Sequence, residues 1–160
     1  MKKIVLPSLL LLLALSLNAQ KHDANWCFGV NAGLDFNDTS GIIRYETIVN
    51  SRETAASISD VNGELQFYIS RISINEPYLV SFKDRNNQTI VNGDSIKVCL
   101  SATNGSMILP KPGDNKHHFL MFHLNCFENT SCNNGYCFET MFSEIVKENG
   151  ILKVKRKNIK

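Results

Sequence analysis

The sequence lacks the short motifs by which several enzyme classes are recognised. It contains no G-x-S-x-G, H-E-x-x-H or G-x-x-x-x-G-K-[ST] segment. Cys126, Cys132 and Cys137 follow a C-x₅-C-x₄-C spacing, whereas structural zinc sites use four ligands and closer pairs. On a strand, His117 and His118 point to opposite faces, so they do not converge on one ion. We therefore predict no catalytic residue, no metal and no cofactor.

The chain also lacks an apolar run long enough for a membrane-spanning helix, which needs about 20 residues. The run Ile4–Leu17 is interrupted by a proline and by serines, and two lysines precede it. With Ala19 at its end, segment 1–19 has the three regions of a signal peptide. A membrane anchor is the alternative. We expect no membrane span and export to the periplasm, the cell surface or the extracellular space, with a mature chain that starts at Gln20.

An excess of charge is absent as well. Two of the 17 basic residues lie in segment 1–19, which leaves 15 basic and 15 acidic residues in 20–160. Nucleic-acid-binding domains normally have a strong basic excess, so we expect no nucleic-acid partner. The local exception is the C-terminal segment with Lys153, Lys155, Arg156, Lys157 and Lys160. We interpret it as a solvated, frayed end, with contact to an anionic surface as the alternative.

A helical period is almost absent from 20–160, and turn signals recur along it. Segment Asp60–Gly63 predicts a hairpin loop with Gly63 at the position that takes positive φ. The expected strands are Ile42–Val49, Leu65–Ile69, Tyr78–Phe82, Ile96–Leu100, Ser106–Leu109, His117–His123, Phe138–Val146 and Ile151–Lys155. We predict one all-β domain of consecutive antiparallel hairpins, which fits a propeller or a small sandwich.

Five cysteines in an exported protein indicate disulfides. Cys126, Cys132 and Cys137 lie in a segment rich in Asn, Ser, Thr and Gly, which we interpret as a long loop. We expect at least one bridge among these three. Cys27 and Cys99 lie on expected strands, as buried thiols or as a second pair. The odd number leaves at least one free thiol.

The stretch Asn25–Phe36 (NWCFGVNAGLDF) holds the one tryptophan of the chain. Its aromatic and glycine residues predict a short strand, a tight turn and a second short strand, with Trp26 in the core. Asp60 opens the later hairpin loop, where aspartate is normally structural. The residues that define these motifs are Trp26, Phe28, Gly29, Gly33, Asp35, Phe36, Asp60 and Gly63.

Together with Ala55–Tyr68 (AASISDVNGELQFY) and Met107–Gly113 (MILPKPG), this stretch resembles the start of a family of large secreted surface proteins. These proteins come from gliding-type bacteria that use type IX secretion. The resemblance implies the first blades of a β-propeller and no enzymatic activity. Because the family proteins continue well beyond the equivalent of Lys160, it implies an incomplete propeller. We expect self-association, or completion of the sheet array by other blades or a partner.

These observations predict an exported, non-catalytic segment with a structural, adhesive or ligand-presenting role at the cell surface, and with carbohydrate or a surface protein as partner. One alternative is a sialidase-like or glycosidase-like propeller enzyme, which would need a carboxylate pair drawn from Asp35, Asp38 and Asp60. Another is a non-functional fragment of a larger surface protein. Asp94-Ser95-Ile96 resembles the D-[ST]-hydrophobic O-glycosylation site of such bacteria, so Ser95 is a candidate for modification.

Overall fold

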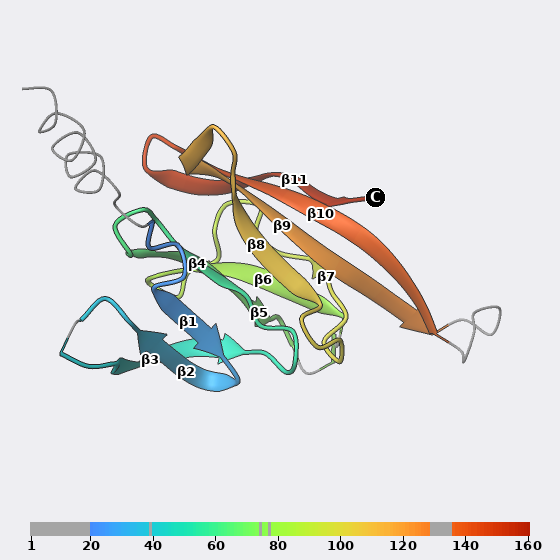
Figure 1. Cartoon of the computed structure of the whole chain (residues 1–160). Helices are drawn as coiled ribbons and strands as arrows, with labels where there is room; N and C mark the ends of the chain where they lie inside the picture. Colours follow the sequence, from blue (N-terminus) through green and yellow to red (C-terminus); the bar gives the residue numbers. More distant parts are fainter. Residues whose placement is uncertain (1–19, 39, 74, 77, 129–135) are drawn as a thin grey trace, which may run out of the picture.

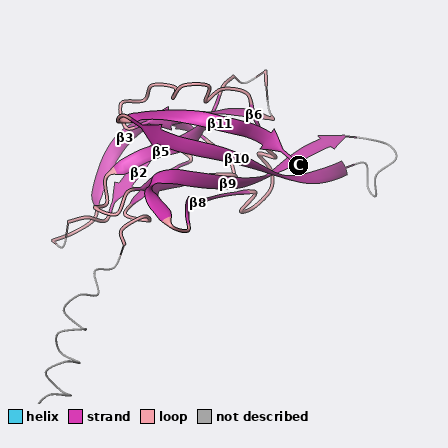
Figure 2. Cartoon of the chain, turned by 90° about the horizontal axis from the view of Figure 1, so that it is seen from above, coloured by secondary structure: helices cyan, strands magenta, loops and turns pink. Residues whose placement is uncertain are grey.

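The computed structural model describes residues 20–38, 40–73, 75–76, 78–128 and 136–160. The signal peptide expected at 1–19 therefore lies outside the described part. The strands are β1 (Asn25–Phe28), β2 (Val30–Asp35), β3 (Ile43–Asn50), β4 (Ser57–Ser59), β5 (Leu65–Arg71), β6 (Leu79–Asp84), β7 (Ile96–Lys97), β8 (Ser106–Lys111), β9 (Asp114–Glu128), β10 (Tyr136–Glu148) and β11 (Ile151–Ile159). The described residues form no helix (Figure 2), and successive strands pair antiparallel within each sheet. The predicted all-β class and its consecutive hairpins are confirmed.

The strands form three sheets, each in sequence order: an N-terminal sheet (β1–β3), a middle sheet (β4–β7) and a C-terminal sheet (β8–β11). In Figure 1 the green middle sheet lies between the blue N-terminal sheet and the orange C-terminal sheet. Strand β5 is buried on both faces. Phe67 and Ile69 belong to the main core, whereas Tyr68 packs with Cys27 and Val49 of the N-terminal sheet. The middle sheet is therefore the layer to which both others attach.

The main core lies between the middle and C-terminal sheets. Phe67 makes edge-to-face contacts with Phe82 of β6 at 5.4 Å and with Phe119 of β9 at 5.5 Å between ring centroids. Such pairs contribute beyond the area that they bury. Alternation along β9 and β10 directs Met121 and Ile145 into the same core. The two four-stranded sheets therefore pack face to face around one apolar cluster.

One edge of this pair of sheets is closed by hydrogen bonds. Val91, in the connection between β6 and β7, donates to the Leu152 carbonyl at 3.2 Å and accepts from the Val154 amide at 2.9 Å. Propeller blades contact each other through side chains, whereas a hydrogen-bonded edge is typical of closed sandwiches and barrels. This link favours the sandwich interpretation for these two sheets. The propeller remains a prediction from the resemblance.

The residues in two of the hairpin turns explain the backbone geometry of these turns. Gly63 has φ 91° and closes the predicted loop, while Asp60 Oδ1 accepts hydrogen bonds from the Asn62 and Glu64 amides. Asn149 and Gly150 form the two-residue turn between β10 and β11, both with positive φ, which is the hairpin geometry that this dipeptide favours. The Asp60–Gly63 hairpin is confirmed.

All four strands of the C-terminal sheet extend beyond the ranges expected from the sequence, and β8 and β11 are the most informative. Strand β8 continues through Pro110 to Lys111, because β8 is an edge strand and the missing amide removes no bond from the sheet. Strand β11 runs to Ile159, so the interpretation of the basic segment as a frayed end is wrong. Its cations pair with acidic side chains: Lys157 with Asp94 at 2.9 Å and Lys160 with Glu139 at 2.5 Å.

The one disulfide among the described residues joins Cys99 to Cys126, with their Cα atoms 5.0 Å apart. It ties the segment after β7 to β9, and so links the middle sheet to the C-terminal sheet. The expected bridge from Cys126 to Cys132 or Cys137 is wrong, because Cys126 lies on β9 and its sulfur is bonded to Cys99. A bridge between Cys132 and Cys137 concerns side chains outside the described part. Cys27 is free and buried, so its pairing with Cys99 is wrong.

Candidate functional site

The first two sequence motifs meet in space. Gly63, in the β4–β5 turn, accepts hydrogen bonds at its carbonyl from Asn25 Nδ2 at 2.7 Å and from Asn37 Nδ2 at 2.8 Å. Asn37 is held in turn by Asp35 Oδ1, which accepts from its amide and its side chain, both at 2.8 Å. Added to Gly63, a Cβ would collide with Asn37. Asp35 and Gly63 are therefore structural residues that dock the N-terminal sheet onto the β4–β5 hairpin.

The two glycines of the first hairpin have different roles. Gly29 has φ 63° and lies in the turn between β1 and β2, as predicted. Gly33 lies within β2, where a Cβ would come within 2.5 Å of the Tyr45 ring. Tyr45 covers this glycine, and its hydroxyl lies 3.4 Å from the buried Cys27 sulfur. Burial raises the pKa of the Cys27 thiol, and the hydrogen bond with Tyr45 offsets only part of this rise, so the thiol stays protonated and unreactive.

The aromatic residues of the first hairpin lie at the surface. Trp26 is 53% exposed, and Phe28 and Phe36 are each 38% exposed. Trp26 and Phe28 alternate with the buried Asn25 and Cys27 along β1, so both point outward. The prediction of a core tryptophan is wrong, because the β1 face that packs on the middle sheet carries the small polar residues. Trp26 contacts Phe36 with ring centroids 5.1 Å apart.

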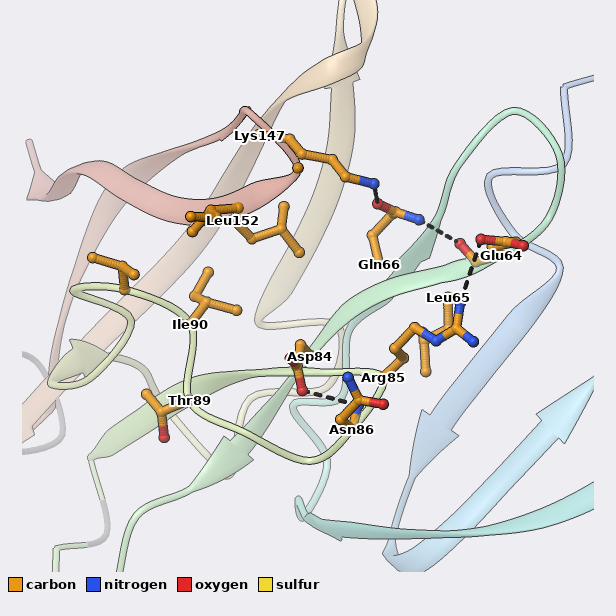
Figure 3. A pocket seen from close by; sticks show the side chains of 13 residues that line it. Glu64, Leu65, Gln66, Asp84, Arg85, Asn86, Thr89, Ile90, Lys147 and Leu152 are labelled. Carbon is orange, nitrogen blue, oxygen red and sulfur yellow. Dashed lines mark hydrogen bonds and ion pairs between the residues drawn. The ribbon is translucent and has the colours of Figure 1, made fainter.

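A groove runs beside these motifs, formed by two adjoining hollows of about 370 and 500 Å³. Both are lined by Glu64, Leu65 and Arg85. We call the two hollows together the Glu64–Arg85 groove. The larger hollow lies between the N-terminal sheet and the β4–β5 turn. The smaller one, drawn in Figure 3, extends to Lys147 and Leu152 at the β10–β11 turn. The groove therefore has walls from all three sheets.

The polar groups of the groove are paired with one another. Arg85 forms an exposed ion pair with Glu64 at 3.4 Å. Lys147 Nζ donates to Gln66 Oε1 at 2.8 Å (Figure 3), so a lysine of the C-terminal sheet is tied to the middle sheet. Asp84 Oδ1 accepts from the Asn86 amide at 2.9 Å and orders the turn below them. Apolar residues complete the lining: Leu65, Ile90, Val91, Ile151 and Leu152.

The three carboxylates considered for glycoside hydrolysis occupy different positions. Asp35 lines the larger hollow, together with Glu64. Asp60 serves the hairpin turn. Asp38 is exposed and accepts from the Ser40 hydroxyl and amide, and these hydrogen bonds lower the pKa of its carboxyl. No two of Asp35, Asp38 and Asp60 therefore line the same hollow. The carboxylate that lines the larger hollow together with Asp35 is Glu64.

A charge cluster around a buried glutamate, which the sequence reasoning missed, lies on the C-terminal sheet. Glu144 is 3% exposed and pairs at 2.5 Å with His118 Nε2 and with Arg156 Nε, while Lys111 Nζ lies 3.8 Å away. Burial raises the pKa of the Glu144 carboxyl, but the hydrogen bonds from Arg156 and His118 outweigh it and lower the pKa. Strand register alone brings these residues together, and no local pattern signals it.

His118 and His123 both lie on β9. His123 is buried, bonds to Ser143 at 3.1 Å, and its pKa is lowered by burial. His118 faces the opposite side of β9 and belongs to the charge cluster. In the described part of the chain, His, Cys, Asp and Glu side chains form no group of three or more that could hold a metal ion. Ser95 is exposed in the turn before β7, with φ 54°.

Within the described residues, no helix has the length and apolar character needed to cross a membrane. Comparisons with protein-family models, curated proteins and solved structures find no match for the chain.

Proposed function

We propose that the chain is an exported, non-catalytic binding module that presents the Glu64–Arg85 groove to a ligand at the cell surface. The observation that carries this proposal is the groove itself. It has walls from all three sheets, with charged side chains above an apolar lining. Concave sites of this composition are the usual places for ligand binding. Export is supported by the signal-peptide pattern of 1–19 and by the Cys99–Cys126 disulfide, which is typical of oxidising compartments.

Binding is favoured over catalysis because the polar groups that line the groove have structural tasks. Asp35 orders Asn37, Asp84 orders its turn, and Lys147 joins two sheets through Gln66. The exposed pair of Arg85 and Glu64 exchanges readily with a ligand, because such ion pairs contribute little to stability. A carbohydrate or the surface of another protein is the expected ligand.

A glycosidase is the second candidate function, since Asp35 and Glu64 line the same hollow. Hydrolysis of a glycosidic bond uses two carboxyl groups across the scissile bond. The discriminating assay uses a panel of fluorogenic glycosides with the exported chain, Asp35→Asn and Glu64→Gln. If the unmodified chain hydrolyses a glycoside and both variants lose this activity, the protein is a glycosidase and the proposal of a binding module is wrong.

The binding experiment uses the purified exported chain on a glycan array and on a peptide array. We expect retention that falls at least tenfold in the double variant Glu64→Ala/Arg85→Ala, since both side chains are exposed and line both hollows. Lys160→Ala is the matched control, because Lys160 is an exposed, ion-paired lysine that lines neither hollow. Retention that is equal in the double variant and the control would contradict binding in the groove, as would the absence of retention on both arrays.

A further inference from the structure

A separate cavity of about 430 Å³ lies between β1 and β8, outside the Glu64–Arg85 groove. We call it the aromatic cavity. Trp26 and Phe28 of β1 form one side, and Met107 of β8 belongs to the other. The Ala55–Ala56 pair leaves room between them, since these side chains are small. The volume lies within the range of about 300–1,000 Å³ that is typical of small-ligand sites.

The tryptophan of this cavity is exposed yet held in place. Half of its surface is accessible, and Phe36 packs against the indole at 5.1 Å. A large exposed aromatic ring that is already oriented offers contact area at a low cost in conformational entropy. Its π face is negative and attracts polarised C–H groups. The ring is therefore suited to a ligand with a flat array of C–H bonds.

A buried hydroxyl gives the second, independent observation. Ser106 lines the cavity and is 8% exposed, and its Oγ has no hydrogen-bond partner among the described residues. A buried polar group without a partner is unusual and costly, so a ligand group that forms a hydrogen bond with it would gain affinity. The neighbouring Ser57 hydroxyl differs, because it donates to the Asn25 carbonyl at 2.8 Å and accepts from the Cys27 amide at 3.2 Å.

Charge restricts the ligand further. The described residues that line the aromatic cavity carry no charged side chain. An anionic ligand would lose its hydration there without gaining a counter-charge. A neutral pyranose ring fits all three observations, since it has a face of C–H bonds, hydroxyl groups at its edge and no charge.

We propose that the aromatic cavity binds an uncharged hexopyranose unit of a glycan, with the ring against Trp26 and a sugar hydroxyl bonded to Ser106. The site is distinct from the Glu64–Arg85 groove, so the two proposals fail independently. Because Trp26 is the only tryptophan of the chain, its fluorescence reports on this cavity alone.

The experiment titrates the exported chain with hexamers of glucose, mannose, galactose and N-acetylglucosamine, and with an oligogalacturonate in which every ring is anionic. We expect at least one neutral hexamer to shift the Trp26 emission to shorter wavelength in a saturable manner, and the oligogalacturonate to produce no shift. Absence of a saturable response to all four neutral hexamers, or an equal response to the oligogalacturonate, would overturn the proposal.

Variants then locate the site by calorimetry with the responding hexamer. We expect Trp26→Ala to weaken binding at least tenfold, Trp26→Phe to weaken it less, and Ser106→Ala to weaken it about threefold to tenfold with no loss of thermal stability. Removal of an unpaired hydroxyl does not destabilise the fold, so this variant separates binding from folding. Phe138→Ala is the control, because Phe138 is an exposed aromatic residue of β10 that does not line the cavity. Unchanged affinity in both Trp26→Ala and Ser106→Ala would overturn the assignment.

Discussion

The main core and the attachment of the N-terminal sheet are held together in different ways. Among the described residues, the main core joins the middle and C-terminal sheets through fourteen buried apolar residues. In the same part of the chain, the N-terminal sheet shares a cluster of only three buried residues, Cys27, Val49 and Tyr68, with the middle sheet. Partly buried Tyr45 and Leu65 pack against this cluster, and hydrogen bonds add to it, such as those from Asn25 Nδ2 to the Gly63 carbonyl and from the Asn50 amide to Ser70 Oγ at 3.0 Å.

The two regions therefore contribute differently: the main core stabilises the fold, and the N-terminal sheet exposes aromatic side chains. Apolar burial is non-directional and dominates folding free energy, whereas a hydrogen bond adds little net stability but fixes geometry. The main core therefore supplies most of the stability, and the N-terminal sheet is positioned by polar contacts that leave Trp26 and Phe28 exposed. We expect this sheet to open at lower free energy than the main core.

Phe67→Ala should have the largest effect. Phe67 is fully buried and contacts Phe82 and Phe119, so its truncation leaves a cavity between two sheets. We expect a loss of about 3–5 kcal/mol in the free energy of unfolding, measured by urea denaturation and circular dichroism. Val49→Ala, in the smaller cluster, is the comparison and should cost less. A larger loss for Val49→Ala would reverse the proposed order of the two regions.

Removal of the disulfide should come next. In Cys99→Ala/Cys126→Ala, the cross-link between residues 27 apart in sequence is lost, and we expect a decrease of about 3 kcal/mol. The melting temperature of the exported chain should fall on addition of a reducing agent, and that of the double variant should fall by less. Cys27→Ala should keep the response, since its thiol is free. Equal melting temperatures of oxidised wild type and double variant would argue against this pairing.

Glu144→Gln should destabilise the C-terminal sheet in a pH-dependent manner. The folded-state pKa of Glu144 lies below its ordinary value of 4.5, so its charged form stabilises the fold above that pH. This contribution is lost as the pH falls through the lower, folded pKa. We expect a loss of about 1.5–3 kcal/mol at about pH 7, and a smaller difference from wild type at about pH 3.

Urea denaturation across that pH range measures the difference between Glu144→Gln and wild type. Glu139→Gln is the control, since Glu139 pairs with the exposed Lys160 and its replacement should cost less. A difference between Glu144→Gln and wild type that grows on acidification would contradict the ion-paired role of Glu144.

Gly33→Ala should have the smallest effect, confined to the N-terminal sheet. The added methyl group would displace the Tyr45 ring, which is half-buried and able to move. We expect a loss of about 1 to 2 kcal/mol. Trp26 fluorescence should report a transition at lower urea than circular dichroism, and the gap between the two should widen in the variant. Coincident transitions in both proteins would show that the N-terminal sheet unfolds with the main core.

Local sequence signals predicted the secondary structure better than the site. The Asp60–Gly63 turn and the alternation of Leu65–Ile69 are short-range features, because turn chemistry and the two-residue period of a strand act over a few residues. The same period places Trp26 and Cys27 on opposite faces, but it does not say which face is covered. Trp26 was therefore assigned to the core, although the covered face carries Asn25 and Cys27.

Short-range signals in the sequence predict the all-β class, the consecutive hairpins and the positive φ of Gly63, since each depends on neighbouring residues. The partner of Cys126, the burial of Glu144 and the convergence of Glu64, Arg85 and Lys147 on one groove become visible only in the folded chain. These depend on strand register and on which sheet faces pack together. Both are set by apolar burial summed over residues far apart in the chain, a long-range quantity that no short segment contains.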